Sequence, residues 1–116
     1  MHRREVKQST FVKVAEISEI PSGQMKVVNI EEKEILIANV NGTYYAIGNI
    51  CTHKEGDLSK GTLHGTTVTC PKHNAKFDVA TGKVISYPKV GFFHPKVADA
   101  PSFAVKVEKE SIMVNL

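Results

Sequence analysis

The sequence predicts an all-β fold, an antiparallel β-sandwich built from short strands. Three observations lead to this prediction. Short runs rich in β-branched residues are separated by turn residues about every 8 to 12 positions. No stretch shows the period of apolar residues that is typical of a helix. The dipeptide Asn41-Gly42 stands between two such runs, and it favours a two-residue turn between antiparallel strands.

The expected strands follow one another along the whole chain. The first four lie at residues 11–14, 25–30, 34–40 and 43–47, and Asn41-Gly42 joins the last two. Further strands are expected at residues 66–69, 75–78, 83–87, 102–107 and 112–115, with Gly82 turning one pair. Residues 89–101 contain glycine, alanine and prolines and have poor strand character, so we expect an ordered loop there.

Length and composition limit the possible classes of protein. The 116 residues, 12.7 kDa, are expected to form one domain covering residues 1–116. Apolar residues make up 41% and charged residues 23%, which excludes a disordered chain. No run approaches the roughly 18 apolar residues of a membrane span. Arg3-Arg4 is not followed by the apolar segment of an export signal, so a cytoplasmic location without membrane association is expected.

The net charge of +3 is concentrated in one part of the chain. Between Cys51 and Lys89 the sequence has six lysines against three acidic residues, whereas basic and acidic residues balance elsewhere. Such a small excess does not indicate nucleic-acid binding, because an electrostatic footprint on phosphates needs many more contacts. We therefore expect no nucleic-acid partner.

Two short motifs carry ligand chemistry, Cys51-Thr-His53 and Cys70-Pro-Lys-His73. Each follows an expected strand, so the two loops can face each other. Each then supplies one thiolate and one imidazole. Four such groups at one point would be too costly to desolvate unless they bound metal, and the pattern therefore predicts a metal site.

The order of the ligands separates two kinds of metal site. Zinc fingers usually place both cysteines before both histidines, whereas here Cys and His alternate. Two ligands only two positions apart, as in Cys51 and His53, are awkward around one tetrahedral ion. They suit a two-iron core, in which cysteines and histidines bind different irons. The pattern therefore favours a [2Fe-2S] cluster, and a structural zinc module for protein interaction stays open as an alternative.

The segment from Asn49 to Pro88 resembles soluble Rieske-type ferredoxins of the low-potential branch that lacks a disulfide. The resemblance rests on both ligand motifs, on Leu58 and Gly61 between them, and on Phe77-Asp78, Ala80-Thr-Gly-Lys83 and Tyr87-Pro88 after them. It implies that Cys51 and Cys70 bind one iron and that His53 and His73 bind the other. It also implies that Pro88 lies in a loop shielding the cluster. A cluster-binding subdomain at about 48–88 would be inserted into a base sandwich at about 5–47 and 89–116.

The sequence departs from the high-potential Rieske proteins in ways that predict a low potential. Gly56 and Lys72 stand where that branch has a disulfide, and Ala75 and Phe77 where it has a serine and a tyrosine hydroxyl. A donor to sulfur stabilises the more negative, reduced state. A difference of about 1 kcal/mol per hydrogen bond shifts a one-electron potential by roughly 40 mV.

The resemblance implies one-electron transfer rather than catalysis. The protein would relay electrons from an NAD(P)H-dependent reductase to a terminal oxygenase or another redox enzyme. We find no Ser-His-Asp arrangement and no phosphate-binding glycine loop in the sequence, and four protein ligands leave no vacant position for substrate. A Rieske-like small subunit of a larger reductase, such as assimilatory nitrite reductase, is the alternative within the same resemblance.

Other notable side chains have simpler interpretations. His2, His64 and His94 have no Cys or His partner at ligand spacing and are not expected to bind metal. Phe92-Phe93 is expected to pack its loop onto the core, with a docking patch as the alternative. Lysines next to the ligands would form a positive rim that steers an acidic partner, or would serve solubility alone; they are Lys54, Lys72 and Lys76.

Overall fold

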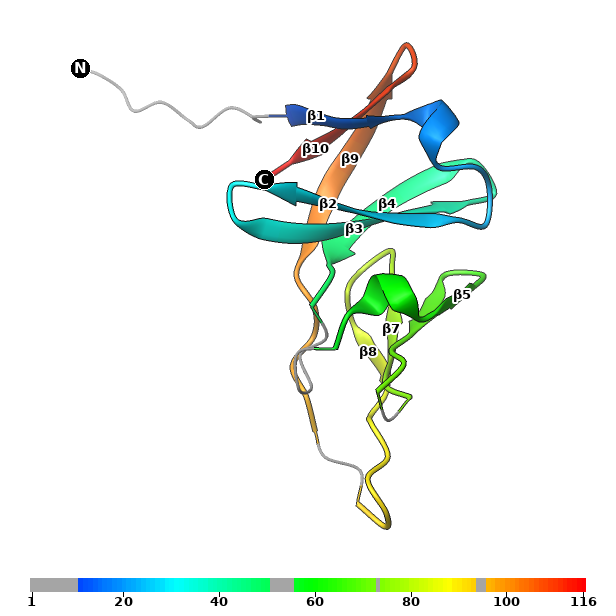
Figure 1. Cartoon of the computed structure of the whole chain (residues 1–116), viewed down its shortest axis with the longest axis vertical. Coiled ribbons are helices and arrows are strands. Elements are labelled where there is room, and N and C mark those ends of the chain that lie inside the picture. The colour runs from blue at the N-terminus through cyan, green and yellow to red at the C-terminus, as the bar shows by residue number, and fades with distance from the viewer. Residues whose placement is uncertain (1–10, 51–55, 73, 94–95) are drawn as a thin grey trace, which may run out of the picture.

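Two antiparallel sheets make up the computed structural model, which describes residues 11–50, 56–72, 74–93 and 96–116. A six-stranded sheet has the order β1-β10-β9-β4-β3-β2, and a four-stranded sheet has the order β5-β6-β7-β8. Figure 1 shows the larger sheet at one end of the molecule and the smaller one below it. This arrangement confirms the all-β antiparallel prediction. Across the part of the chain that is described, no helix is long and apolar enough to cross a membrane.

The strand bounds agree closely with the expected ones. The large sheet contains β1 (Phe11–Glu16), β2 (Met25–Ile30), β3 (Lys33–Val40), β4 (Thr43–Gly48), β9 (Ser102–Glu108) and β10 (Ser111–Asn115). The small sheet contains β5 (Thr62–His64), β6 (Thr67–Thr69), β7 (Lys76–Asp78) and β8 (Val84–Ser86). Two single-turn 3-10 helices are present as well, η1 (Ile17–Glu19) and η2 (Leu58–Lys60).

The hairpin between β3 and β4 confirms the turn prediction. Val40 pairs with Thr43, and both residues of the turn have positive φ, 53° at Asn41 and 91° at Gly42, as a type I′ turn requires. The side chain of Asn39 stabilises the turn through hydrogen bonds. Its buried side chain accepts a hydrogen bond from the Gly42 N–H at 2.7 Å and donates one to the Ile20 carbonyl at 2.8 Å.

Strand β5 was not expected from the sequence. Only Leu63 of its three residues is apolar, so the segment lacks the β-branched run that predicts a strand. The segment is a strand because it pairs with β6, across a short turn in which Gly65 has a φ of 61°. The two 3-10 helices are single turns and leave no helical period in the sequence.

The buried side chains of β3 alternate between two hydrophobic clusters. Leu36 and Ala38 belong to a cluster shared with the small sheet, and Ile35 and Ile37 to one shared with β1 and β10. Successive side chains of a strand point to opposite faces, so β3 is buried on both sides. Each fully buried Leu or Ile contributes about 1.5–3 kcal/mol. The first cluster holds the small sheet, and with it Cys70, against the large one.

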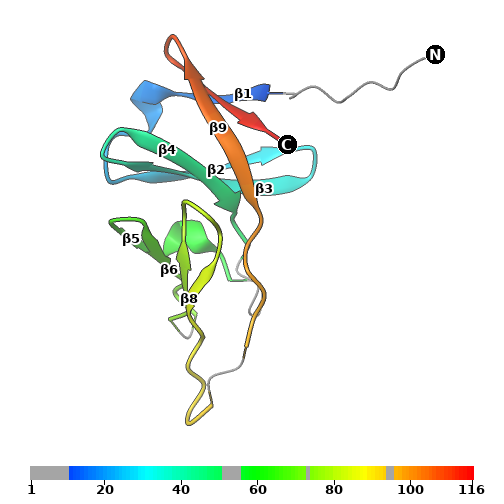
Figure 2. The same cartoon turned by 180° about the vertical axis from the view of Figure 1, so that it is seen from behind.

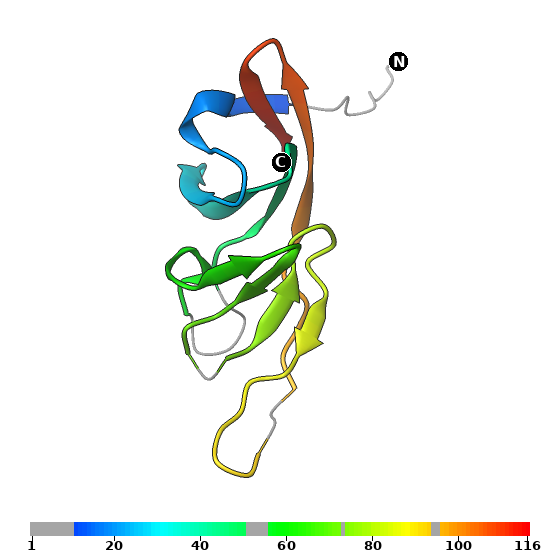
Figure 3. The ribbon, with the colours of Figure 1, turned by 90° about the vertical axis from the view of Figure 1, so that its right-hand side faces the viewer.

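The connection from β8 back to β9 is fastened where it returns to the large sheet. The Gly48 N–H donates to the Pro101 carbonyl at 2.9 Å, and the Ala100 N–H donates to the Gly82 carbonyl at 2.7 Å. A Cβ at Gly82 would lie 2.1 Å from the Ala100 oxygen, so only glycine fits there. Before this point the connection extends away from the large sheet, as Figures 2 and 3 show, and it forms the expected loop with one isolated bridge, Val90–Phe93.

The first and last strands pair with each other in the large sheet. Strands β1 and β10 are antiparallel neighbours, with Phe11 paired to Asn115 and Glu16 to Ser111. Both strands lie in the large sheet, on the side away from the tip of the β8–β9 connection (Figure 1).

Candidate metal centre

Cys70 follows directly after β6 and its side chain is fully buried. Its N–H donates to the Ala75 carbonyl at 2.7 Å, which closes a tight turn in which Asn74 has a φ of 61°. The N–H of Lys72 points at the Cys70 sulfur, at 3.4 Å. A backbone donor aimed at sulfur stabilises the thiolate, but a buried thiolate is costly unless a cation also balances its charge. A thiolate at Cys70 would therefore have the Lys72 N–H as a donor and would need a cation close to it.

The other three predicted ligands lie outside the described residues. These are Cys51 and His53, both within residues 51–55, and His73. The structure does describe the residues on both sides of the segment 51–55 and of His73. It therefore shows how the loops are anchored, and the convergence of the four ligands stays a prediction.

A buried asparagine joins the two ends of the first ligand loop. The carboxamide of Asn49 donates to Glu34 Oε1 at 3.0 Å and to Asp57 Oδ1 at 2.7 Å, and it accepts from the Ser59 N–H at 2.8 Å. The backbone adds to this, because the Leu58 N–H donates to the Asn49 carbonyl at 3.0 Å and Ile50 pairs with Asp57 as an isolated bridge. The chain on both sides of residues 51–55 is thus attached to β3 through Asn49.

Asp57 completes the same network. Its carboxylate accepts hydrogen bonds from the Ser59 hydroxyl at 2.6 Å, the Ser59 N–H at 3.0 Å and Asn49. These donors, the hydroxyl first, hold the pKa of Asp57 below its usual value. Sequence reasoning did not identify Asn49 or Asp57. The signal was the Asp57-Leu-Ser59 pattern, in which an aspartate caps the first turn of a helix.

The segment after the first motif is packed against the residues around the second motif. Leu58 lies in one hydrophobic cluster with Cys70, Ala75 and Phe77, all fully buried. Gly61 allows the close approach, because a Cβ at that position would lie 1.8 Å from the Thr69 carbonyl oxygen. Thr69, which precedes Cys70, is thereby held against Gly61, the residue that follows η2. This packing supports the prediction that both motifs serve one site.

Ala75 and Phe77 contribute only apolar atoms to this cluster. Phe77 pairs with Val68 across β6 and β7 and has no exposed surface. Among the residues the structure describes, the Lys72 N–H is therefore the donor to the Cys70 sulfur, and no hydroxyl accompanies it. Pro88, expected to shield the cluster, is buried after β8.

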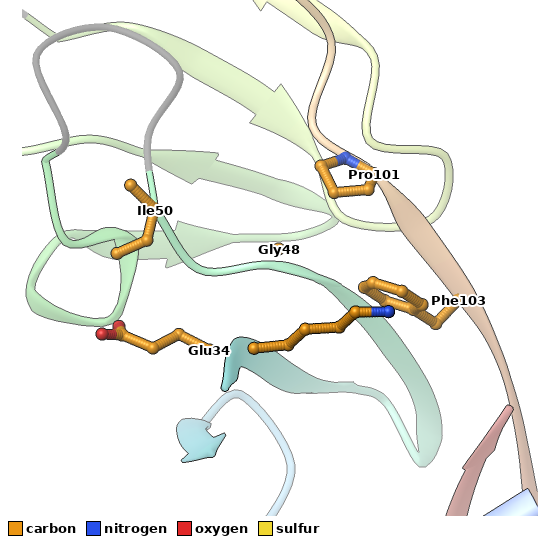
Figure 4. A pocket seen from close by; sticks show the side chains of 6 residues that line it. Glu34, Gly48, Ile50, Pro101 and Phe103 are labelled. Carbon is orange, nitrogen blue, oxygen red and sulfur yellow. The ribbon is translucent and has the colours of Figure 1, made fainter. Parts of the chain in front are cut away.

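An open apolar hollow of about 390 Å³ is lined by residues of β3, β4 and β9 and by their neighbours in sequence (Figure 4). Ile50, the residue before Cys51, forms one wall, and Pro101 and Phe103 form the other. Lys33 also lines the hollow, and its ammonium lies 5.9 Å from the centre of the Phe103 ring. Glu34 faces it too and is engaged by Asn49.

The positive charge of the small-sheet region is left unbalanced. Residues 56–101 contain six lysines and three aspartates. All three carboxylates accept internal hydrogen bonds, Asp57 as above, Asp78 from the Ala80 N–H at 2.8 Å and Asp99 from the Val84 N–H at 2.9 Å. The salt bridges among the described residues lie in the other part of the fold, Lys13–Glu16, Lys26–Glu19 and Lys106–Glu108.

The interpretation of Phe92-Phe93 as a packing element was wrong. The side chain of Phe92 is 98% exposed and that of Phe93 is 73% exposed. The two rings do not pack onto the core because the connection between β8 and β9 extends away from the large sheet. His64 is exposed in β5. His2 and His94 lie outside the described residues.

Comparison with known proteins identifies similar chains of the same size. The family model for the Rieske [2Fe-2S] domain matches residues 10–106. The ferredoxin component of the naphthalene 1,2-dioxygenase system of Pseudomonas aeruginosa is 32% identical over 106 residues, which cover 91% of this chain and 95% of that one. The biphenyl dioxygenase ferredoxin subunit of Pseudomonas sp. (strain KKS102) is 41% identical over 80 residues, 68% of this chain and 73% of the relative.

A solved structure has the same fold. It is the complex of reduced oxygenase and oxidized ferredoxin in carbazole 1,9a-dioxygenase, of which one chain is matched with a TM-score of 0.77 and 30% identity. The match covers 89% of this chain and 99% of that chain.

Proposed function

The chain belongs to the Rieske [2Fe-2S] domain family, and from this membership we propose that it is a one-electron carrier that delivers electrons to an oxygenase. Its cofactor is a [2Fe-2S] cluster. We further propose that the protein is a carrier and not itself an enzyme, and that its electrons come from an NAD(P)H-dependent reductase. The observation that carries the proposal is the fully buried Cys70 beside the Lys72 N–H, in a chain that matches the family along almost its whole length.

The residues present fit such a cluster. We propose that Cys51 and Cys70 bind one iron and His53 and His73 the other. When bound, the cluster supplies a site that takes up and releases one electron. The protein's own part is to hold the two loops in register. Asn49 and Asp57 anchor the first loop to β3, and Gly61 holds it against the residue before Cys70.

Ligand charge and the surrounding donors set the expected potential. Two thiolates and two neutral imidazoles give a less negative site than four thiolates, so the midpoint should exceed the value of about −400 mV for plant-type ferredoxins. Ala75 and Phe77 offer no hydroxyl, so the midpoint should lie near the low end of the Rieske range, about −150 mV.

We propose that the two sheets divide the work. Residues 48–88, which contain the small sheet and both motifs, would form the cluster-binding subdomain, and residues 5–47 and 89–116 the base sandwich. The separate hydrophobic cluster formed by β1, β3 and β10 supports a base with its own core. We also propose a cytoplasmic location, because thiolate ligands are favoured over disulfides in a reducing compartment.

The test is the metal content and the magnetic spectrum of anaerobically purified protein. We expect two irons and two sulfides per chain. In the oxidised protein both irons would be ferric, and two thiolates would complete the charged groups of the site. The reduced protein should have an EPR signal with a lower average g value than all-cysteine clusters, because imidazoles replace two thiolates. His53→Ala and His73→Ala should each abolish this signal. Colourless protein with one zinc per chain would contradict the proposal.

A further inference from the structure

The two most exposed aromatic side chains of the described residues are adjacent in sequence. Phe92 and Phe93 lie in the connection between β8 and β9, which extends away from the large sheet in Figures 1 and 3. Exposed apolar groups of this size are costly to hydrate, and where they gather on a soluble protein they mark an interaction site. Other exposed apolar side chains of the same region are Ile50, Ile85 and Tyr87, at 40%, 52% and 39%, whereas the large sheet has only Val107 in this class among its described residues.

The aromatic pair is held in place by a closed turn. The Val90 N–H donates to the Phe93 carbonyl at 2.9 Å, and the Phe93 N–H donates to the Val90 carbonyl at 2.8 Å. Gly91 has a φ of 60°, and glycine with positive φ at the first central position is typical of a type II′ hairpin turn. The rings are thus presented on an ordered support, and a partner that buries them does not have to order this backbone first.

The charge around the turn selects the kind of surface that it fits. Lys89 precedes the turn and Lys96 follows it, and both are exposed. The one carboxylate of this connection, Asp99, is already engaged by the Val84 N–H. Lys72, next to Cys70, is exposed as well. A complementary surface therefore has an apolar hollow for the rings and acidic side chains around it.

We propose that Phe92 and Phe93 are the docking anchor for the oxygenase that accepts the electron, and that they insert into an acidic-rimmed apolar hollow on its surface. The proposal rests on the proposed function. The turn between β6 and β7, which carries Cys70, points away from the large sheet, as the anchor does (Figures 1 and 3). A ferredoxin and its oxygenase form a complex that has been solved in carbazole 1,9a-dioxygenase.

The area available is sufficient for a transient complex. An aromatic side chain buries roughly 150–250 Å². Weak redox encounters bury less than about 1,200 Å² in total. Two rings would therefore provide a large share of such an interface, and losing them should affect docking far more than the loss of one rim lysine.

The experiment compares electron delivery by the wild-type holoprotein and by the double variant Phe92→Ser with Phe93→Ser. Reduced protein is mixed anaerobically with the oxidised oxygenase components of the naphthalene, biphenyl and carbazole dioxygenase systems, and the second-order rate is read from the visible absorbance. With every oxygenase that the wild type reduces, we expect the double variant to be slower by about tenfold or more, which is the loss typical of an interface anchor. The variant Phe92→Leu with Phe93→Leu should retain most of the rate.

The matched control is Val107→Ser, which removes an exposed apolar side chain from β9 instead of the turn. It should leave the rate unchanged. Lys89→Glu with Lys96→Glu should also lower the rate and reduce its dependence on ionic strength, whereas Lys109→Glu, in the turn between β9 and β10, should not. All variants should keep the wild-type midpoint potential and EPR signal, which separates docking from damage to the cluster.

Four results would overturn the inference. Equal rates for wild type and the double serine variant would show that Phe92 and Phe93 do not anchor the complex. A loss confined to reduction by the reductase of the same systems would assign the rings to the electron donor. A wild-type dimer that the double variant abolishes in sedimentation would assign them to a second copy of this chain. If the wild type reduced none of the three oxygenases, the proposed function itself would fail, and the inference with it.

Discussion

Replacing Asn49 by alanine is expected to loosen the first ligand loop more than the rest of the protein. The substitution removes three hydrogen bonds of a fully buried side chain, to Glu34, to Asp57 and from the Ser59 N–H. Hydrogen bonds to charged groups contribute about 1.5–3 kcal/mol and neutral ones about 1 kcal/mol. Glu34 is exposed and Asp57 half-buried, so water replaces part of the loss, and the Ser59 N–H keeps Asp57 at 3.0 Å. We therefore expect a cost of about 2–4 kcal/mol.

Asn39 provides a matched control. It too is a buried asparagine with hydrogen bonds to Ile20, Tyr44 and Gly42, but it supports the β3–β4 turn and not a ligand loop. Asn39→Ala and Asn49→Ala should both lower the thermal midpoint of the holoprotein, by roughly 10 °C or more at a fixed scan rate. Only Asn49→Ala should also raise the population in which the first loop is open.

The assay is the loss of visible absorbance in the presence of an iron chelator, below the temperature of unfolding. A local opening that becomes easier by about 1.4 kcal/mol is about ten times more populated. Asn49→Ala should therefore lose its cluster at least about tenfold faster than Asn39→Ala. Equal rates in the two variants, or a change in thermal midpoint of Asn49→Ala too small to measure, would refute the reasoning that this network anchors the loop.

Three further predictions concern the same site. Ala75→Ser with Phe77→Tyr should raise the midpoint potential by roughly 40 mV for each hydroxyl that reaches sulfur, read by voltammetry, and an unchanged potential would show that neither does so. Gly61→Ala should reduce the iron content of purified protein, because its Cβ would meet the Thr69 carbonyl at 1.8 Å; full iron content would mean that the loop can shift without loss. Because the pKa of Asp57 is lowered by folding, its contribution to stability is complete above its unfolded value of about 3.9 and is lost as the pH falls further. The difference in thermal midpoint between wild type and Asp57→Asn should therefore shrink from pH of about 6 to about 3, and a difference that stays constant would contradict this.

The strands were predictable because their signals are local. Asn41-Gly42 determines its own turn through positive φ, and the β-branched runs that flank it form β3 and β4 with bounds within one residue of those expected. Strand β5 has no such run and exists because β6 pairs with it. Residues whose structure depends on a neighbour in sequence could be predicted, and residues that depend on a partner strand could not.

The candidate ligand motifs stand out by their spacing, and ligation by them stays a prediction, whereas the residues that anchor the neighbouring chain could not be predicted. Asn49 differs from any other polar residue after a strand only because Glu34 and Asp57, distant in sequence, converge on its carboxamide. Phe92, by contrast, was singled out in the sequence, but its environment was predicted wrongly. An aromatic pair is usually buried, and its exposure follows from the path of the whole connection, which no local pattern encodes.

The pairing of β1 with β10 decides how this protein can be attached to a surface. Phe11 lies opposite Asn115, so a tether attached at either of these residues leaves from the large sheet, on the side away from the tip of the β8–β9 connection. On an electrode, such a tether would place an insulating layer of apolar side chains between the metal surface and the ligand loops. Adsorption to a negatively charged electrode through the exposed lysines of the small-sheet region, Lys72, Lys83 and Lys89, would turn the molecule round and bring those loops to the surface. The two ways of immobilising one protein should therefore give slow and fast interfacial electron exchange, respectively.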